Sequence, residues 1–250
     1  MIDVHSHILP EVDDGAFDFH ESRKMGEILV ENGFEKVFCT PHVIDEDGSR
    51  LSRERIRECV RDLSRFFEEE GIPLQVFEGA EYYMDRALCE MTRFFHPLCT
   101  LNGSNYLLLE LPLLNWPPYI GERTWPELLE DKELRDILPF LRPVIAHPER
   151  YAEVVRQPRR LKELRENGYL FQVNLESITG VAGKQRYKLV KKMAKEGLID
   201  LVGTDGHSSE GLAGFLPGFR KKAEKLLGKR AGKVLEENPA LVLENKVIEI

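Results

Sequence analysis

The sequence has few features of secreted, disulfide-linked or membrane-inserted proteins. Its four cysteines, at positions 39, 59, 89 and 99, form no Cys-x-x-Cys pair, so neither a zinc ribbon nor a redox dithiol is indicated and a reduced chain is expected. No hydrophobic run is long enough to cross a bilayer. The chain begins directly with a strand-like segment, which leaves no room for a cleavable signal peptide. We therefore expect a cytoplasmic protein without membrane insertion.

Positive charge is also scarce, because 35 lysines and arginines face 43 aspartates and glutamates, for a net charge of −8. Proteins that grip long nucleic acids usually show a basic footprint, so nucleic acid is not an expected partner. An anionic substrate would need local positive charge from metal or arginine. The 250 residues, 42% of them hydrophobic, fit one α/β barrel, and without repeats or linkers we expect a single domain over residues 1–250.

Short apolar segments alternate with amphipathic ones along the chain. The clearest helix lies between Ser52 and Gly71, where apolar residues recur at helical spacing. Further helices are expected over 18–32, 124–141, 161–167, 183–196 and 219–237. Strands are expected at the N-terminus and over 36–39, 74–77, 106–109, 143–146, 169–173 and 199–202. This alternation predicts a parallel sheet with helices outside it, and in a closed barrel the carboxyl ends of the strands meet on one face.

One cysteine pattern suggests a different chemistry. Cys59 followed by Arg65 matches the Cys-x5-Arg pattern of thiol-dependent tyrosine phosphatases, in which backbone amides cradle a phosphate at the start of a helix. Here Cys59 lies in the middle of a predicted helix on its apolar face, and no glycine-rich loop surrounds it. We therefore interpret Cys59 as a core residue.

Metal-type side chains follow the predicted strands. His5 and His7, one residue apart, can chelate a divalent ion, and similar residues follow most later strands. Asp13 competes with Asp14 as a ligand, and Glu78 competes less well with Glu81. His20 and His96 have no such context and are expected at the surface or in packing. The candidate ligands are His5, His7, Asp14, His42, Glu81, Glu110, His147, Asp205 and His207.

In order, these motifs resemble those of the polymerase-and-histidinol-phosphatase (PHP) superfamily. The segments that carry the resemblance are His5-Ser6-His7, Thr40-Pro41-His42, Glu81, Glu110, His147-Pro148-Glu149-Arg150 and Asp205-Gly206-His207. More narrowly, residues 2–8 followed by 12–15 resemble the manganese-dependent tyrosine phosphatases found with bacterial capsule and exopolysaccharide genes, the CpsB/YwqE type. The resemblance runs from residue 1 to the tail at 238–239.

The resemblance implies a distorted (β/α)7 barrel, similar to a TIM barrel, that holds three divalent metal ions. Manganese is expected, with iron or zinc as alternatives. The implied ligand sets are His5, His7, Glu81 and Asp205 for the first ion, Glu81, Glu110 and His147 for the second, and Asp14, His42 and His207 for the third. Glu81 would bridge the first two ions. Such cations would neutralise the crowded carboxylates and give an acidic chain a positive pocket.

The implied activity is hydrolysis of a phosphomonoester, by attack of a metal-bound hydroxide, on a phosphotyrosine protein such as a tyrosine autokinase of polysaccharide synthesis. Arg150 is the candidate for holding phosphate oxygens, with an ion pair to an acid such as Glu149 as its alternative role. Asp205 and His207 are further catalytic candidates, although as metal ligands they would be poor acids. The chain departs from the family's pattern in one place. The arginine that follows the last motif is missing from residues 208–213, and the next one downstream is Arg220.

Three other functions remain open. Histidinol phosphatase or another small-molecule phosphatase could use the same barrel. A catalytically silent protein that binds metal and docks to a polysaccharide-assembly kinase would belong to a different class. An exonuclease is disfavoured by the charge of −8.

Overall fold

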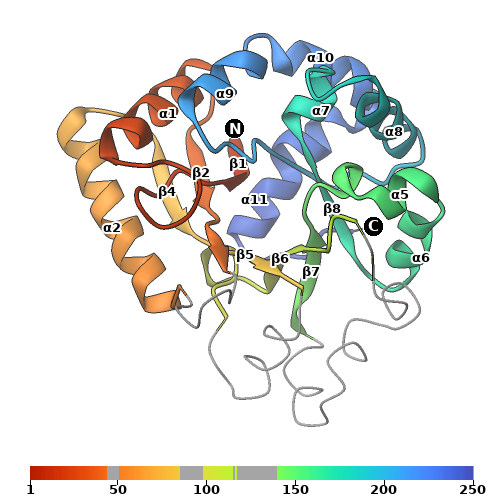
Figure 1. Cartoon of the computed structure of the whole chain (residues 1–250), viewed down its shortest axis with the longest axis horizontal. Helices are drawn as coiled ribbons and strands as arrows, with labels where there is room; N and C mark the ends of the chain where they lie inside the picture. The colour runs from red at the N-terminus through yellow and green to blue at the C-terminus, as the bar shows by residue number, and fades with distance from the viewer. Residues whose placement is uncertain (44–50, 85–97, 115, 117–139, 250) are drawn as a thin grey trace.

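Parallel strands form the centre of the molecule, with helices around them (Figure 1). The computed structural model describes residues 1–43, 51–84, 98–114, 116 and 140–249. The strands in this part are β1 (Ile2–Ser6), β2 (Lys36–Cys39), β3 (His42–Val43), β4 (Gln75–Glu78), β5 (Glu81–Tyr83), β6 (Tyr106–Glu110), β7 (Arg142–Ile145), β8 (Leu170–Asn174) and β9 (Leu201–Gly203).

The nine segments are seven barrel strands, because two strands are interrupted. β2 and β3 form one strand broken at Thr40 and Pro41, and β4 and β5 form another broken beside it, so that β2 pairs with β4 and β3 with β5. Every following strand pairs in parallel with its neighbour, from β5 through β9. Ser6 bridges Gly206, which brings the chain after β9 back to β1. The described chain is therefore a distorted (β/α)7 barrel, as predicted.

Helices lie outside the strands (Figure 1). The α-helices in the described residues are α1 (Phe19–Glu31), α2 (Arg53–Glu70), α5 (Ala152–Arg156), α6 (Arg160–Glu166), α7 (Leu175–Thr179), α8 (Lys184–Lys195), α9 (Ser209–Phe215), α10 (Phe219–Leu227) and α11 (Asn238–Leu243). Shorter turns are η1 (Leu101–Gly103), η4 (Pro148–Arg150), η5 (Gly228–Arg230) and η6 (Lys233–Glu237).

Helix ends follow the capping residues visible in the sequence. The Ser52 hydroxyl accepts a hydrogen bond from the backbone N–H of Arg55 at the start of α2, and Gly71 ends that helix in the left-handed conformation. The helix predicted over 219–237 is divided, because Gly228 leaves helical geometry with φ 57° and ψ −128°. Most of the helix predicted over 124–141 falls at 117–139, outside the described residues.

Alternation along the strands separates an inner core from an outer one. In β6, Tyr106 and Leu108 belong to the inner cluster, whereas Leu107 and Leu109 pack outward against the helices. Val242 and Ile248 also join the inner cluster, and the Tyr106 hydroxyl donates to the Lys246 carbonyl (2.6 Å). The C-terminal segment therefore covers the amino ends of the strands and leaves their carboxyl ends for the site.

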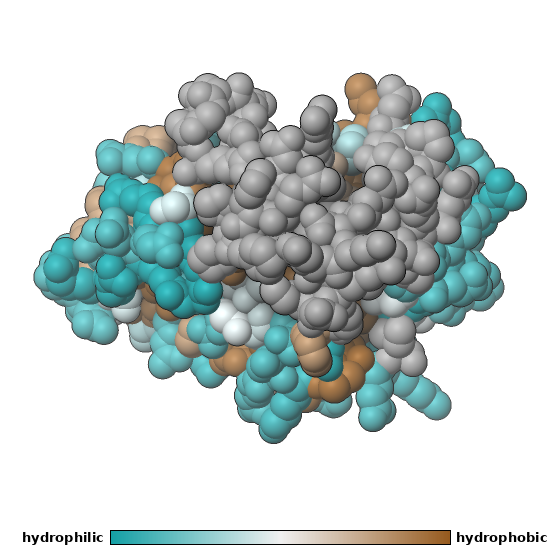
Figure 2. Space-filling view, turned by 90° about the horizontal axis from the view of Figure 1, so that it is seen from below, coloured by the Kyte–Doolittle hydropathy of each residue, from teal (hydrophilic) through white to brown (hydrophobic). Residues whose placement is uncertain are grey.

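The described surface seen from below is mostly hydrophilic, with small hydrophobic areas (Figure 2). Among the described residues, none of the helices combines the length and hydrophobicity required of a membrane span.

The contact between Asp3 and Thr204 is expected to stabilise the closure of the barrel. The buried Asp3 carboxylate accepts hydrogen bonds from the Thr204 backbone N–H (2.9 Å) and hydroxyl (2.6 Å). Thr204→Val removes the hydroxyl and leaves a buried acceptor short of a partner, which should lower the free energy of unfolding by about 1–3 kcal/mol. Urea denaturation measures this loss. Thr204→Ser keeps the hydroxyl and should stay close to the parent, and equal losses in both variants would contradict the assignment.

Candidate metal centre

Seven of the nine predicted ligands lie in the strands or directly after them, at the carboxyl end of the barrel. The strand period explains part of this arrangement, since Glu110 continues the inner face of Tyr106 and Leu108. His5 and Glu81 are fully buried, as is His147, which follows β7. His7 and Asp14 come from the loop after β1, and His207 follows β9.

Four ligand atoms form a compact group. His5 Nε2 lies 3.4 Å from both Glu81 Oε2 and Asp205 Oδ1 and 3.1 Å from His7 Nε2. His7 Nε2 lies 3.6 Å from the same Glu81 oxygen and 3.4 Å from the same Asp205 oxygen. Donor atoms about 2.1 Å from one ion in tetrahedral geometry are separated by about 3.4 Å. The spacing therefore fits a single divalent ion held by these four side chains.

Glu81 also faces a second group of donors. Its other oxygen, Oε1, lies 3.0 Å from His147 Nε2, and that nitrogen is 3.7 Å from Glu110 Oε1. His42 Nδ1 approaches Glu81 Oε2 at 3.0 Å. The two oxygens of one buried carboxylate thus point to different donors, which is the arrangement required of a bridging ligand.

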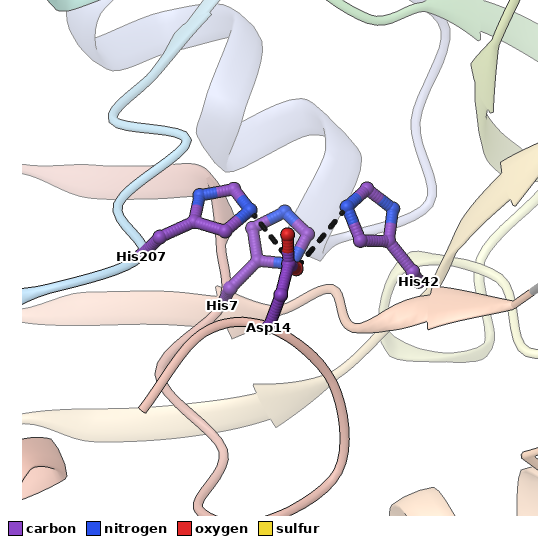
Figure 3. A group of neighbouring side chains, drawn as sticks. All are labelled: His7, Asp14, His42 and His207. Atoms are coloured by element: carbon purple, nitrogen blue, oxygen red, sulfur yellow. Dashed lines mark ion pairs between the residues drawn. The ribbon is translucent and has the colours of Figure 1, made fainter. Parts of the chain in front are cut away.

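A third group lies closer to solvent (Figure 3). Asp14 Oδ1 is 3.6 Å from His42 Nε2 and 3.3 Å from His207 Nε2. The His7 and His207 rings stack with centroids 4.0 Å apart, so His7 stands between this group and the first. The Asp14 side chain is 71% exposed, which places this group at the mouth of the site.

The neighbouring aspartates have different positions. Asp13 Oδ2 is 2.7 Å from His7 Nδ1 and accepts a hydrogen bond from the His42 backbone N–H (3.0 Å). Its other oxygen accepts from the Gly15 backbone N–H. Asp13 therefore orients His7 from behind and leaves Nε2 for an ion, whereas Asp14 faces the site. The geometry favours Asp14 as the ligand between the two candidates.

Two positioning residues were not predicted as part of the site. Gln172 Oε1 lies 2.9 Å from His5 Nδ1, and its amide donates to Asn174 Oδ1 (3.0 Å). Asn174 in turn donates to Asp205 Oδ2 (2.7 Å). Both residues continue the inward face of β8 after Leu170, so the period of two within that predicted strand is the signal that could have found them.

The electrostatics of the site require cations. Burial alone would raise the pKa of Glu81 and Asp205, but the nearby histidines, His5 foremost, outweigh it and lower both carboxyl pKa values well below normal. Burial would lower the pKa of His5, yet Glu81 and Asp205 raise it to about 9. Glu81 Oε2 and Asp205 Oδ1 are buried and accept no hydrogen bond. Divalent ions would satisfy these oxygens, so the donor set fits metal.

Unusual backbone geometry supports the arrangement. His147 (φ 31°) and Asp205 (φ 52°) adopt the left-handed region, which is costly for residues other than glycine and is often found at functional sites. Gly203 allows the close contact of β9 with β1, since an added Cβ would lie 2.6 Å from the His5 Cβ. Gly15 similarly permits its loop to pack against His7, whose carbonyl oxygen would lie 2.1 Å from an added Cβ.

A cleft of about 750 Å³ adjoins the centre, lined by Asp14, Asp205 and His207 on one side. Arg150 also lines it, and its Nη1 donates to Asp205 Oδ2 (2.7 Å). The alternative ion pair with Glu149 is absent from the described contacts, because the buried Glu149 carboxylate accepts from the Asn174 backbone N–H instead. With its side chain 28% exposed, the Arg150 guanidinium combines a contact to the ligand set with access to the cleft.

Residues considered less suitable lie away from the centre. Glu78 is paired with Arg53 (3.2 Å) and Arg57. His20 is exposed in α1, and His96 lies outside the described residues. Cys59 is buried in α2, and burial raises the pKa of its thiol, which disfavours a reactive thiolate.

Comparison with known proteins places this geometry in a family. The family model described as "Capsular polysaccharide synthesis, CpsB/CapC" matches residues 1–244. The tyrosine-protein phosphatase YwqE of Bacillus subtilis is 32% identical over 248 residues, which cover 99% of this chain and 93% of YwqE.

Solved structures agree with this similarity. A chain from the crystal structures of YwqE from Bacillus subtilis and CpsB from Streptococcus pneumoniae, described as unique metal-dependent tyrosine phosphatases, superposes with a TM-score of 0.87 at 31% identity and covers 100% of this chain and 96% of its own. Histidinol phosphate phosphatase from Lactococcus lactis, at 15% identity and a TM-score of 0.53, covers 94% of each chain and shares the fold.

Replacing Asp13 should weaken metal binding although Asp13 is not a proposed ligand. Asp13→Ala frees His7 Nδ1, so the ring loses its orientation, and affinity for manganese should fall by about 10- to 100-fold. Asp13→Asn keeps an acceptor oxygen and should lose less. Metal content after dialysis against buffered manganese, with circular dichroism as a test of folding, measures the effect. Parent affinity in a folded Asp13→Ala protein would contradict the role.

Proposed function

Since this chain belongs to the CpsB/CapC capsular polysaccharide synthesis family, we propose that it is a metal-dependent protein-tyrosine phosphatase. It hydrolyses the phosphomonoester of a phosphotyrosine protein. The observation that carries the proposal is the convergence of histidines and buried carboxylates, two of whose oxygens lack hydrogen-bond partners, beside a cleft that contains Arg150.

The proposed cofactors are three divalent ions, manganese by preference. His5, His7, Glu81 and Asp205 would hold the first, Glu81, Glu110 and His147 the second, and Asp14, His42 and His207 the third, as the distances between their donor atoms support. When bound, such ions polarise the phosphoryl group and lower the pKa of a coordinated water. The oxygen and nitrogen donors accept manganese, iron and zinc alike.

The chain's own residues position substrate and ligands. Arg150 holds phosphoryl oxygens through its planar guanidinium while one N–H remains on Asp205. Asp205 and His207 contribute to catalysis through the ions they hold, and Asn174 and Asp13 keep Asp205 and His7 in place. The cleft admits a phosphotyrosine side chain from the side of Asp14 and His207.

The proposed phosphoprotein is a tyrosine autokinase of capsule or exopolysaccharide synthesis. The family's description in terms of capsular polysaccharide synthesis supports this choice. A cytoplasmic location and a single domain over residues 1–250 remain predictions from the sequence.

The alternatives have less support. Histidinol phosphatase activity rests on a structural relative that shares only the fold at 15% identity. A silent docking protein would not need nine ligand-type side chains arranged around two unsatisfied buried oxygens.

Chelation and manganese should switch the activity off and on. Protein treated with a chelator should not hydrolyse a phosphotyrosine peptide, and added manganese should restore turnover, because the carboxylates lack their cations without it. Phosphate release is measured for a phosphotyrosine peptide, a phosphoserine peptide and histidinol phosphate. A preference for histidinol phosphate would support the alternative enzyme, and no turnover with manganese would support the silent protein.

Arg150 should act on substrate binding more than on the metal centre. Removing a charge-assisted hydrogen bond costs about 1.5–3 kcal/mol, so Arg150→Gln should lower kcat/KM for the phosphotyrosine peptide by roughly 10- to 100-fold. Metal content should stay at the parent level, and Arg150→Lys should recover part of the loss. If Arg150 served only to fix Asp205, metal content would fall and KM would stay unchanged.

A further inference from the structure

A second hollow, of about 690 Å³, lies between α8 and α10 and has lysines on both sides. Lys191 and Lys195 line it from α8, and Lys222 and Lys225 line it from α10; all four are exposed. Leu226 lies among the lining residues and makes part of the hollow apolar. We call this hollow the lysine groove.

Positive charge is concentrated at this place. The helix α8 carries six basic and no acidic side chains, which leaves a net charge of −14 for the rest of a chain whose total is −8. Among the described residues, none of the four groove lysines has a carboxylate within ion-pair distance. By contrast, Lys24 pairs with Glu21 on α1, and Lys246 pairs with Glu244 after α11. The charge of the groove is therefore available to an anionic partner.

The groove continues from the cleft beside the candidate metal centre. Arg186 on α8 lines the cleft and pairs with Glu176 on α7 (3.3 Å), whereas the next residue, Tyr187, lines the groove. On α7, Glu176 lines the cleft and Thr179 lines the groove. The same two helices thus form walls of both hollows, and a polypeptide whose side chain enters the cleft can extend into the groove.

We propose that the lysine groove binds acidic side chains that flank the phosphotyrosine of the protein substrate, an inference that rests on the proposed function. Aspartates and glutamates would lie between Lys191 and Lys195 on one side and Lys222 and Lys225 on the other. A concave hollow with an apolar part suits an extended polypeptide better than a flat bilayer surface, which favours a protein partner. The groove selects acidic phosphotyrosine segments, and the metal centre hydrolyses them.

The test compares three substrates on the full-length, manganese-loaded protein. These are free phosphotyrosine, a phosphotyrosine peptide flanked by Asp and Glu, and the same peptide with Asn and Gln. The parent should prefer the acidic peptide, and the preference should fall with added salt. In the quadruple variant Lys191→Gln, Lys195→Gln, Lys222→Gln, Lys225→Gln, the KM for the acidic peptide should rise roughly tenfold, as expected for several exposed charge pairs. Its kcat, and both constants for the other two substrates, should not change.

A matched control removes four exposed basic side chains elsewhere: Lys24→Gln, Arg55→Gln, Arg65→Gln and Lys246→Gln. It lowers the net charge equally, and two of its positions are on α2, across the molecule from α8 (Figure 1). The control should keep the parent's KM for the acidic peptide. An equal rise in the control and the groove variant, or no rise in either, would overturn the proposal.

Two binding measurements separate the remaining outcomes. Fluorescence anisotropy of a labelled acidic peptide without phosphate should show binding to the parent and not to the groove variant, whether or not the protein is a phosphatase. Loss of turnover on every substrate with this binding retained would overturn the proposed function alone. Sedimentation with phosphatidylglycerol vesicles that the groove variant loses, together with unchanged peptide kinetics, would overturn the proposal in favour of a membrane surface.

Discussion

Two buried carboxylates, Glu81 and Asp205, impose the constraint on which the rest of the site depends. Each is removed from water, and each keeps one oxygen without a hydrogen-bond donor. Buried charge of this kind persists only when opposite charge compensates it. Protonated histidines compensate it in the absence of metal, which is why the pKa of His5 is raised. Divalent ions supply the same compensation and leave the imidazoles neutral, so metal binding and proton release are coupled.

The barrel meets this constraint through its period of two. The inward residues of each strand are apolar near the amino end and polar near the carboxyl end, as in β8, where Leu170 is followed by Gln172 and Asn174. A closed barrel brings these polar ends together without buried loops. Left-handed backbone at His147 and Asp205 then turns the chain directly after a strand, so that side chains just past the strand end also face inward.

Much of this fold and site could be predicted from sequence, because strand-end histidines and acids are visible as residue types at fixed positions. The helix from Arg53 to Glu70 has both caps in the sequence, and Lys36–Cys39 is a strand with the predicted bounds. What sequence could not decide depends on three-dimensional contacts. Asp13 and Asp14 are equally good ligands as residue types, and only the 2.7 Å contact of Asp13 with His7 separates them. Gln172 has no distinctive motif, since amides in buried strands also serve packing. The break of the C-terminal helix at Gly228 arises where an isolated glycine could equally have continued it.

The two oxygens of Asp205 link metal and substrate in one side chain. Oδ1 faces His5 and His7, whereas Oδ2 accepts hydrogen bonds from Arg150 and Asn174. An ion that withdraws negative charge from Asp205 weakens its hold on Arg150, and the guanidinium then has more positive charge available for a phosphoryl group. Asn174 keeps the carboxylate in place during this change because its amide is neutral. An acidic chain thereby gains a cationic substrate contact whose strength depends on occupation of the metal centre.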